Sequence, residues 1–208
     1  MMKIFLITLF CFSSLAYSKE ISISFDDAPR GDNHYFPGEQ RAGKIIKALK
    51  KVGVDKVIFY SNPGKIKKDK EKFDRLMRYH KAGHLIGNHT FDHLSANKVT
   101  SEEFLKNFNL ADDYLVKMKV RSKFFRYPYL RRGETQKKIN TIHKEIIERG
   151  YIDGYVTVDN YDFYMDHLFQ QALKNKKKIN FGNLKKFYVE TLMKSVRFFD
   201  NLSTKELK

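Results

Sequence analysis

Apolar β-branched segments alternate with segments of helical periodicity, and this alternation limits the fold more than any other feature of the chain. Strands are predicted at residues 21–25, 56–60, 84–88, 123–127 and 155–158, and helices at 40–51, 68–82, 102–117 and 134–149. Thr100 and Glu103 form a capping box at the start of the third helix. Such an alternation pairs strands in parallel through helical crossovers, so we expect an α/β fold, either an open sheet or a barrel. Ligands of such folds bind just after the strands.

The N-terminal segment has the pattern of a secretory signal peptide. One positive charge at Lys3 precedes an apolar run over residues 4–12, and small residues stand at Ala16 and Ser18. A transmembrane anchor is the alternative, but the run is shorter than the roughly 20 residues that a bilayer span needs. We therefore expect cleavage after Ser18, export to the periplasm or the medium, and one domain over residues 19–208.

The composition limits both the chemistry and the partners. The only cysteine, Cys11, lies in the predicted signal peptide, so a metal site in the mature chain must use histidine and carboxylate ligands. The formal net charge of +16 favours membrane surfaces, nucleic acid or acidic wall polymers. No segment resembles a nucleic-acid-binding module, and the lysines are spread over predicted helices, where a solvated face is the ordinary explanation. We expect no nucleic-acid partner and no transmembrane anchor.

Two predicted strand ends carry metal-ligating residue types. Asp26 and Asp27 follow the first strand, and two adjacent carboxylates repel each other unless a cation shares the site. The pair therefore indicates a metal ligand beside a base, although turns and helix caps contain such pairs too. His89 and His93 follow the third strand, and in a helical turn this spacing would turn both imidazoles the same way, as a divalent metal requires. Two surface histidines are the alternative.

Two later strand ends add polar residues. Arg126 follows an apolar strand and could pair with a carboxylate, while Pro128 fixes a turn that points a backbone N–H outward. The segment 157–163 contains Asp159 and Asp162, either of which could be a helix cap.

These four segments, in this order, resemble the first four motifs of the polysaccharide deacetylases, the NodB-homology group of carbohydrate esterase family 4. The matching residues read SFDDAP, NHTFDH, FRYPY and DNYDF, within residues 21–163. The resemblance implies a distorted (β/α) barrel with one divalent metal ion, zinc or another transition metal. It also implies hydrolysis of N-acetyl groups on a polysaccharide that contains N-acetylglucosamine, such as peptidoglycan, a chitin-like polymer or an exopolysaccharide.

The resemblance further implies roles for residues of the first two motifs. Asp26 would be the general base, and Asp27, His89 and His93 would be the metal ligands. Thr90 would brace the histidine loop by a hydrogen bond.

The third and fourth motifs would complete the site. Arg126 would orient Asp26 and keep it ionised, and the N–H of Tyr129 would help to stabilise the oxyanion. Asp159 or Asp162 would support the catalytic residues from behind. The residues expected to contact the substrate are Tyr127, Pro128 and Phe163, the last in a place where the family often has a tryptophan.

A fifth family motif, Leu-x-His on a late strand, would supply the general acid, and no match to it follows the fourth motif. Residues 187–208 predict an amphipathic helix with a polar tail, and His143 and His167 lie in predicted helices outside any motif. Either the barrel lacks its last strand and its general acid, or another group such as protonated Asp26 returns the proton. We favour the first interpretation and expect weak or no activity.

Three other functions fit parts of the sequence. An O-acetyl esterase acting on polysaccharide would use the same ion. A catalytically silent glycan-binding homologue would agree with the missing histidine and with the many tyrosines. Association with membranes or nucleic acid through charge alone would show a steep salt dependence.

Overall fold

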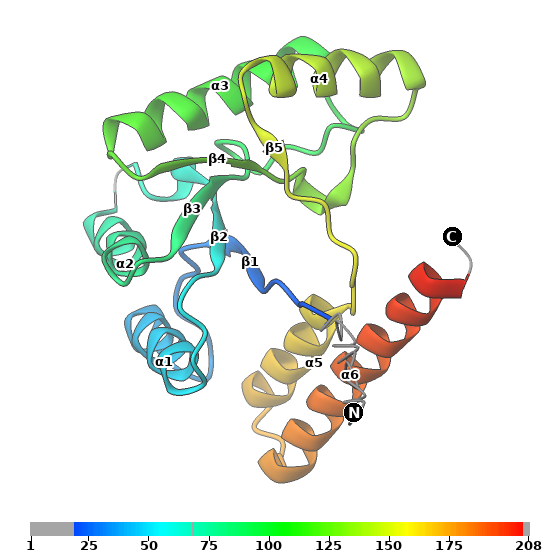
Figure 1. Ribbon diagram of the computed structural model, residues 1–208. Helices are drawn as coiled ribbons and strands as arrows, with labels where there is room; N and C mark the ends of the chain where they lie inside the picture. The colour runs from blue at the N-terminus through cyan, green and yellow to red at the C-terminus, as the bar shows by residue number, and fades with distance from the viewer. Residues whose placement is uncertain (1–18, 68, 206–208) are drawn as a thin grey trace, which may run out of the picture.

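The computed structural model describes residues 19–67 and 69–205 (Figure 1). The predicted signal peptide lies outside the described residues. One parallel sheet forms the centre, and its strands follow one another in chain order. They are β1 (Ser24–Ala28), β2 (Ile58–Ser61), β3 (Leu85–Asn88), β4 (Arg121–Phe125) and β5 (Ile152–Asp153).

Four helices connect these strands and two more follow the last strand. They are α1 (Gly38–Lys51), α2 (Lys70–Lys81), α3 (Ser101–Lys117), α4 (Gln136–Glu148), α5 (Asp162–Lys174) and α6 (Phe181–Lys205), with short 3₁₀ turns η1 (Pro63–Lys65) and η2 (Pro128–Leu130). A sheet built in chain order places its crossovers on one face and curves like the wall of a barrel. Figure 1 shows α1 to α4 around the outer side of the strands. No described helix is long and apolar enough to cross a membrane.

The predicted α/β alternation is confirmed, with two corrections to the strands. The first strand extends through Asp26 and Asp27 instead of ending before them. The strand predicted at 155–158 is wrong, because β4 pairs with Ile152 and Asp153. The N–H of Gly154 then donates to the carbonyl of Phe125 at 2.6 Å, and the chain leaves the sheet.

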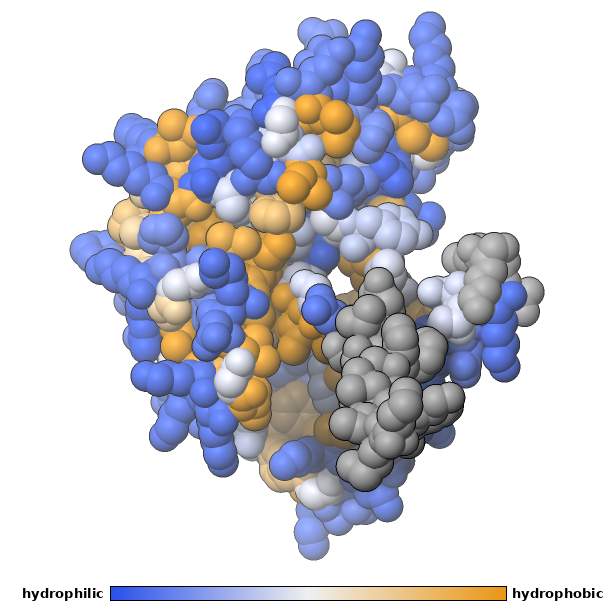
Figure 2. All heavy atoms as spheres, in the orientation of Figure 1, coloured by the Kyte–Doolittle hydropathy of each residue, from blue (hydrophilic) through white to orange (hydrophobic). Residues whose placement is uncertain are grey.

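Two hydrophobic clusters fill the space between the sheet and its helices. One joins β2 and β3 to α1 and α2 and includes the fully buried Phe59 and Leu76. The other joins β4 to α3 and α4, where the Phe125 ring contacts the rings of Phe108 and Tyr127 at centroid distances of 5.1 and 4.8 Å. Figure 2 shows hydrophilic residues over much of one face, with hydrophobic residues between them where α1, α2 and the sheet meet.

The capping box predicted for α3 is confirmed. The N–H of Glu103 donates to Thr100 Oγ1 at 3.1 Å, and the N–H of Thr100 donates to Glu103 Oε2 at 2.7 Å. Two N–H groups that the helix leaves without backbone acceptors are thus satisfied.

Helices α5 and α6 form a hairpin beside the loop that follows β1 (Figure 1). The Tyr35 ring lies 5.3 Å from the Phe169 ring and 5.4 Å from the Phe181 ring, and the N–H of His34 donates to Gln170 Oε1 at 3.0 Å. Neither helix contains a fully buried residue over its described length. The hairpin therefore rests on the loop without entering either core cluster.

We predict that Phe125→Ala destabilises the protein by about 3–5 kcal/mol, because it empties the centre of the second cluster. Phe198→Ala is the matched control, since this α6 ring is 61% exposed; it should change stability by less than about 0.5 kcal/mol. Urea unfolding followed by circular dichroism measures both. Equal losses in the two variants would contradict the assignment of the core.

Candidate metal centre and active site

Strand β1 contributes two carboxylates to one cluster because its pairing with β2 is irregular. In a regular strand, adjacent side chains point to opposite faces. The register shifts between Phe25 and Ala28, and Asp27 has φ 60°, a left-handed conformation that aspartate tolerates better than most residues. As a result, Asp26 reaches Arg126 and Asp27 reaches His93.

The loop after β3 supplies His89 and His93, but not in the helical turn predicted from their spacing. Thr90 and His93 have φ 60°, and no helix is described between β3 and α3. Side chains hold the loop instead: the N–H of Leu94 donates to Thr90 Oγ1 at 3.2 Å, and the N–H of Thr90 donates to Asn88 Oδ1 at 2.8 Å. The ring centroids of His89 and His93 lie 4.9 Å apart. The two imidazoles are therefore brought together by the hydrogen bonds of the loop and not by helical periodicity.

Asp27, His89 and His93 form a candidate donor set for a metal ion. Each offers one ligand atom, and these atoms all lie within 4.8 Å of one another. His89 Nδ1 lies 2.8 Å from the carbonyl oxygen of Arg126. A carbonyl only accepts, so Nδ1 carries the proton and Nε2 presents its lone pair. One carboxylate and two imidazoles suit zinc or a similar transition metal.

The protonation states of the donor set favour cation binding. Burial lowers the pKa of His89 and lowers that of His93 to about 4, so both rings are neutral near pH 7. Burial opposes ionisation of Asp27, but the hydrogen bond and positive charge of Lys65 outweigh it, and the pKa of Asp27 lies below its ordinary value. All three groups are therefore in the form that binds a metal.

Asp26 lies beside the donor set and is held by Arg126. Arg126 Nη1 donates to Asp26 Oδ1 at 2.6 Å, while Asp26 Oδ2 is 3.9 Å from His89 Nε2. The buried guanidinium also donates through Nε to the Gly154 carbonyl at 2.8 Å and lies 4.1 Å from the centroid of the Tyr60 ring. A charge-assisted hydrogen bond from a fixed donor sets the direction of the carboxylate.

Position 154 must be glycine for this arrangement to persist. A Cβ atom on Gly154 would lie 1.9 Å from the hydroxyl oxygen of Tyr60. A larger residue would push away Tyr60 and thereby disturb Arg126. Neither Gly154 nor Tyr60 was predicted as a site residue, because only the paired strands bring them together.

Asn62 is another residue of the site that was not predicted from the sequence. Its side chain is fully buried, and Nδ2 donates to the carbonyls of His89 at 2.5 Å and Thr90 at 3.2 Å. Its Oδ1 accepts from Lys65 Nζ at 3.2 Å. The sequence signal was a polar residue near the end of a predicted strand, similar to the signal that marked Asp26.

The third motif divides between the surface and the core. Tyr129 is 64% exposed, and its ring lies edge-on to His93 at 4.4 Å. Tyr127 was expected to contact the substrate, but it is 3% exposed because it packs against Phe104 and Phe125. Pro128 is also buried. Tyr127 and Pro128 therefore support the loop from the core, and they are not exposed to a substrate.

The fourth motif lies at the start of α5. Asp162 is the first residue of that helix, and partial burial together with the charges of Asp159 and Asp26 raises its pKa. Asp159 is exposed, and Phe163 is 63% exposed. The charge of Asp26 thus contributes to the raised pKa of Asp162, whereas Phe163 is open to solvent.

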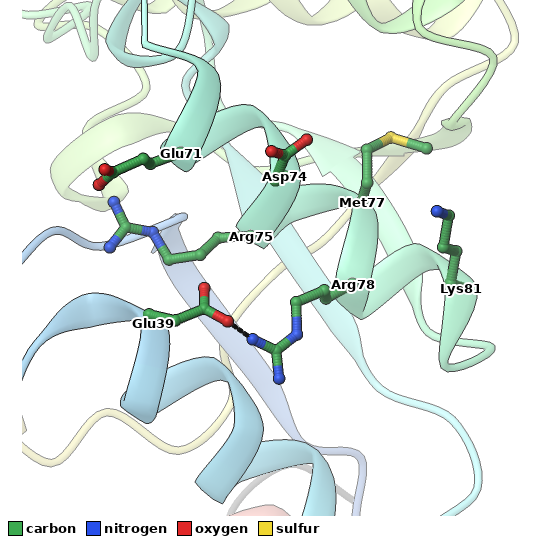
Figure 3. A pocket seen from close by; sticks show the side chains of 7 residues that line it. All are labelled: Glu39, Glu71, Asp74, Arg75, Met77, Arg78 and Lys81. Atoms are coloured by element: carbon green, nitrogen blue, oxygen red, sulfur yellow. Dashed lines mark ion pairs between the residues drawn. The ribbon is translucent and has the colours of Figure 1, made fainter.

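A separate hollow of about 510 Å³ lies between α1 and α2 and contains none of these residues. Figure 3 shows its lining of mostly charged side chains, with an ion pair between Glu39 and Arg78. These groups tie the two helices together and do not form a catalytic combination.

Comparison with known proteins assigns the family. The chain matches the family model described as polysaccharide deacetylase over residues 16–145, which is more than half of its length. The curated peptidoglycan-N-acetylglucosamine deacetylase of Bacillus cereus is 30% identical over 152 residues, which make up 72% of this chain and 50% of the relative. The chain thus spans about half the length of this relative. It belongs to the polysaccharide deacetylase family.

Solved structures with the same fold include proteins that act on carbohydrates. The chitin deacetylase of the fungus Colletotrichum lindemuthianum superposes with a TM-score of 0.57 at 18% identity, over 73% of this chain and 62% of the other. A family 4 carbohydrate esterase of Streptomyces lividans, solved with acetate, gives 0.53 at 17% identity, over 69% and 66%. The predicted NodB-type barrel fold is confirmed.

We predict that Asn62→Ala destabilises the protein by about 1–3 kcal/mol, because two buried carbonyls lose their donor. The variant should also bind zinc more weakly, since the loop that carries His89 loosens. Thermal unfolding and zinc titration measure the two effects. Asn140→Ala removes only an exposed contact with Gln136 and should leave both unchanged; a wild-type zinc affinity in Asn62→Ala would refute the bracing role.

Proposed function

We propose that this protein is a metal-dependent hydrolase that removes N-acetyl groups from N-acetylglucosamine units of an envelope polysaccharide. The observation that carries the proposal is the pairing of Asp26 with Arg126 directly beside the donor set of Asp27, His89 and His93. Membership of the deacetylase family supports the reaction class, and the name of the Bacillus cereus relative supports a glucosamine polymer. Export through the predicted signal peptide would bring the protein to such a polymer.

The geometry supports a hydrolytic reaction. A divalent cation in the donor set would polarise the acetyl carbonyl and make a water molecule more acidic. Arg126 occupies Asp26 Oδ1, which leaves Oδ2 to take a proton from the attacking water. The N–H of Tyr129 would then help to stabilise the tetrahedral oxyanion.

Of the two interpretations of the missing fifth motif, we propose here the second, which the sequence alone did not favour: protonated Asp26 returns the proton that the leaving amine needs. Asp26 is the group that has just gained a proton at the reaction centre, so the transfer needs no further acid. The two histidines outside the motifs have other partners: His143 contacts Arg132, and His167 contacts Gln171. We therefore assign neither of them as the general acid. The exposed ring of Tyr129 beside His93 would stack on the sugar, as would the ring of Phe163.

We predict that Asp26→Asn lowers the rate of acetate release from chitooligosaccharide by at least about 100-fold, because the general base is lost. Zinc binding should remain, since Asp26 is not in the donor set. Asp113→Asn changes an exposed aspartate of another Asp-Asp pair and is the matched control. Chelation should abolish release in the wild type, and added zinc should restore it.

Two experimental outcomes would contradict this proposal and favour another function. Glycan binding without acetate release, equal in wild type and Asp26→Asn, would favour the silent binding protein. Binding that falls steeply with salt and ignores the donor set would favour association through charge alone.

We further predict that the protein releases acetate faster from chitooligosaccharide than from acetylated xylan. The carbonyl carbon of an amide is less electrophilic than that of an ester, so cleavage of the amide needs more stabilisation of the transition state. A site that cleaves the amide must therefore make specific contacts with the N-acetyl sugar in the transition state. Values of kcat/KM on both substrates test this. A clear preference for acetylated xylan would instead establish an O-acetyl esterase.

A further inference from the structure

Lys65, which stands outside all four motifs, touches the predicted metal ligand Asp27. It ends η1, and its Nζ donates to Asp27 Oδ1 at 2.9 Å. The same oxygen is the one nearest to His93 Nε2, at 3.5 Å. The lysine ammonium therefore contacts the carboxylate oxygen that faces the donor set.

Lys65 also reaches the loop that carries the two histidines. Its Nζ donates to Asn62 Oδ1 at 3.2 Å, and Asn62 Nδ2 donates to the carbonyls of His89 and Thr90. One ammonium thus links Asp27 on β1 to the loop after β3. This link holds together the two segments that supply the predicted ligands.

A dication bound by this donor set would share Asp27 with the ammonium. Two cations on one carboxylate repel each other, and the repulsion is strong where burial limits screening. The Asp27 side chain is 26% exposed, so solvent screens it only in part. Arg30 contacts the other oxygen at 3.4 Å from a side chain that is 54% exposed, which makes it the weaker competitor.

We propose that Lys65 competes with the divalent cation for Asp27 Oδ1 and thereby sets the metal affinity of the site. This inference rests on the proposed function, because it takes Asp27, His89 and His93 as the ligands. Lys65 stabilises the metal-free protein and weakens its binding of metal. The metal affinity of the site is then lower, but the cluster of predicted ligands stays assembled without the ion.

Lys65→Met tests the competition because it removes the charge and keeps an apolar side chain. We expect the dissociation constant for Zn²⁺ to fall about tenfold, the order expected when one like charge leaves a partly screened site. We also expect the metal-free variant, in excess chelator, to have a lower Tm than the metal-free wild type. Competition with a chromophoric chelator measures the affinity, and thermal unfolding in excess chelator measures the Tm.

Lys67→Met is the matched control, since Lys67 is an exposed lysine two residues further on. It should leave both quantities at wild-type values. Lys65→Gln removes the charge while keeping a polar side chain, and it should show the same gain in affinity even where Lys65→Met folds poorly.

The outcomes separate the two proposals. Stoichiometric zinc uptake by the wild type, with equal or weaker affinity in both neutral Lys65 variants, would overturn the competition alone. No zinc uptake by the wild type or by any variant would overturn the proposed function, and the competition with it.

Discussion

The site depends on Arg126, because this residue fixes the proposed base and a predicted ligand at the same time. Its guanidinium donates to Asp26, and its carbonyl accepts from His89 Nδ1. The backbone of Arg126 is in turn held by its N–H, which donates to the Asn88 carbonyl at 3.1 Å. A shift of β4 against β3 would therefore move the base and the ligand together. The geometry of the site therefore depends on the register between β3 and β4, and packing of the core cluster around Phe125 stabilises that register.

The parallel sheet explains why residues from distant segments meet. The carboxyl ends of adjacent parallel strands lie on one edge, so β1, β2, β3 and β4 deliver Asp27, Asn62, His89 and Arg126 to the same place. Regular strands would not suffice, because alternation would turn Asp26 and Asp27 to opposite faces. The positive φ of Asp27 removes this obstacle at a cost of about 1–3 kcal/mol, which the ion pairs with Lys65 and Arg30 offset in part.

The alternation of strands and helices predicted the parallel α/β fold, and the four motifs indicated the family. The cluster of Asp26, Asp27, His89, His93 and Arg126 could also be predicted, because four of these residues lie at or next to an apolar strand and His93 lies in the loop after β3. It did not predict the supporting residues Tyr60, Asn62, Lys65 and Gly154, since their contacts arise only when separate strands pair. Tyr127 was placed at the surface because a motif gives the order of residues and not the direction of a side chain. The strand predicted at 155–158 failed for a related reason: its apolar residues satisfied the pattern, but β4 offers partners only to Ile152 and Asp153.

The charges around the donor set favour a reaction that creates negative charge. Asp26 and Asp27 form ion pairs with Arg126, Lys65 and Arg30, so more positive than negative groups take part in these pairs. A divalent cation would add to this excess, which attracts hydroxide and stabilises an oxyanion where these groups are fixed in advance. The same excess opposes the cation itself. A hydrolytic site of this kind gains transition-state stabilisation at the expense of metal affinity, and the position of Lys65 decides how far the balance moves.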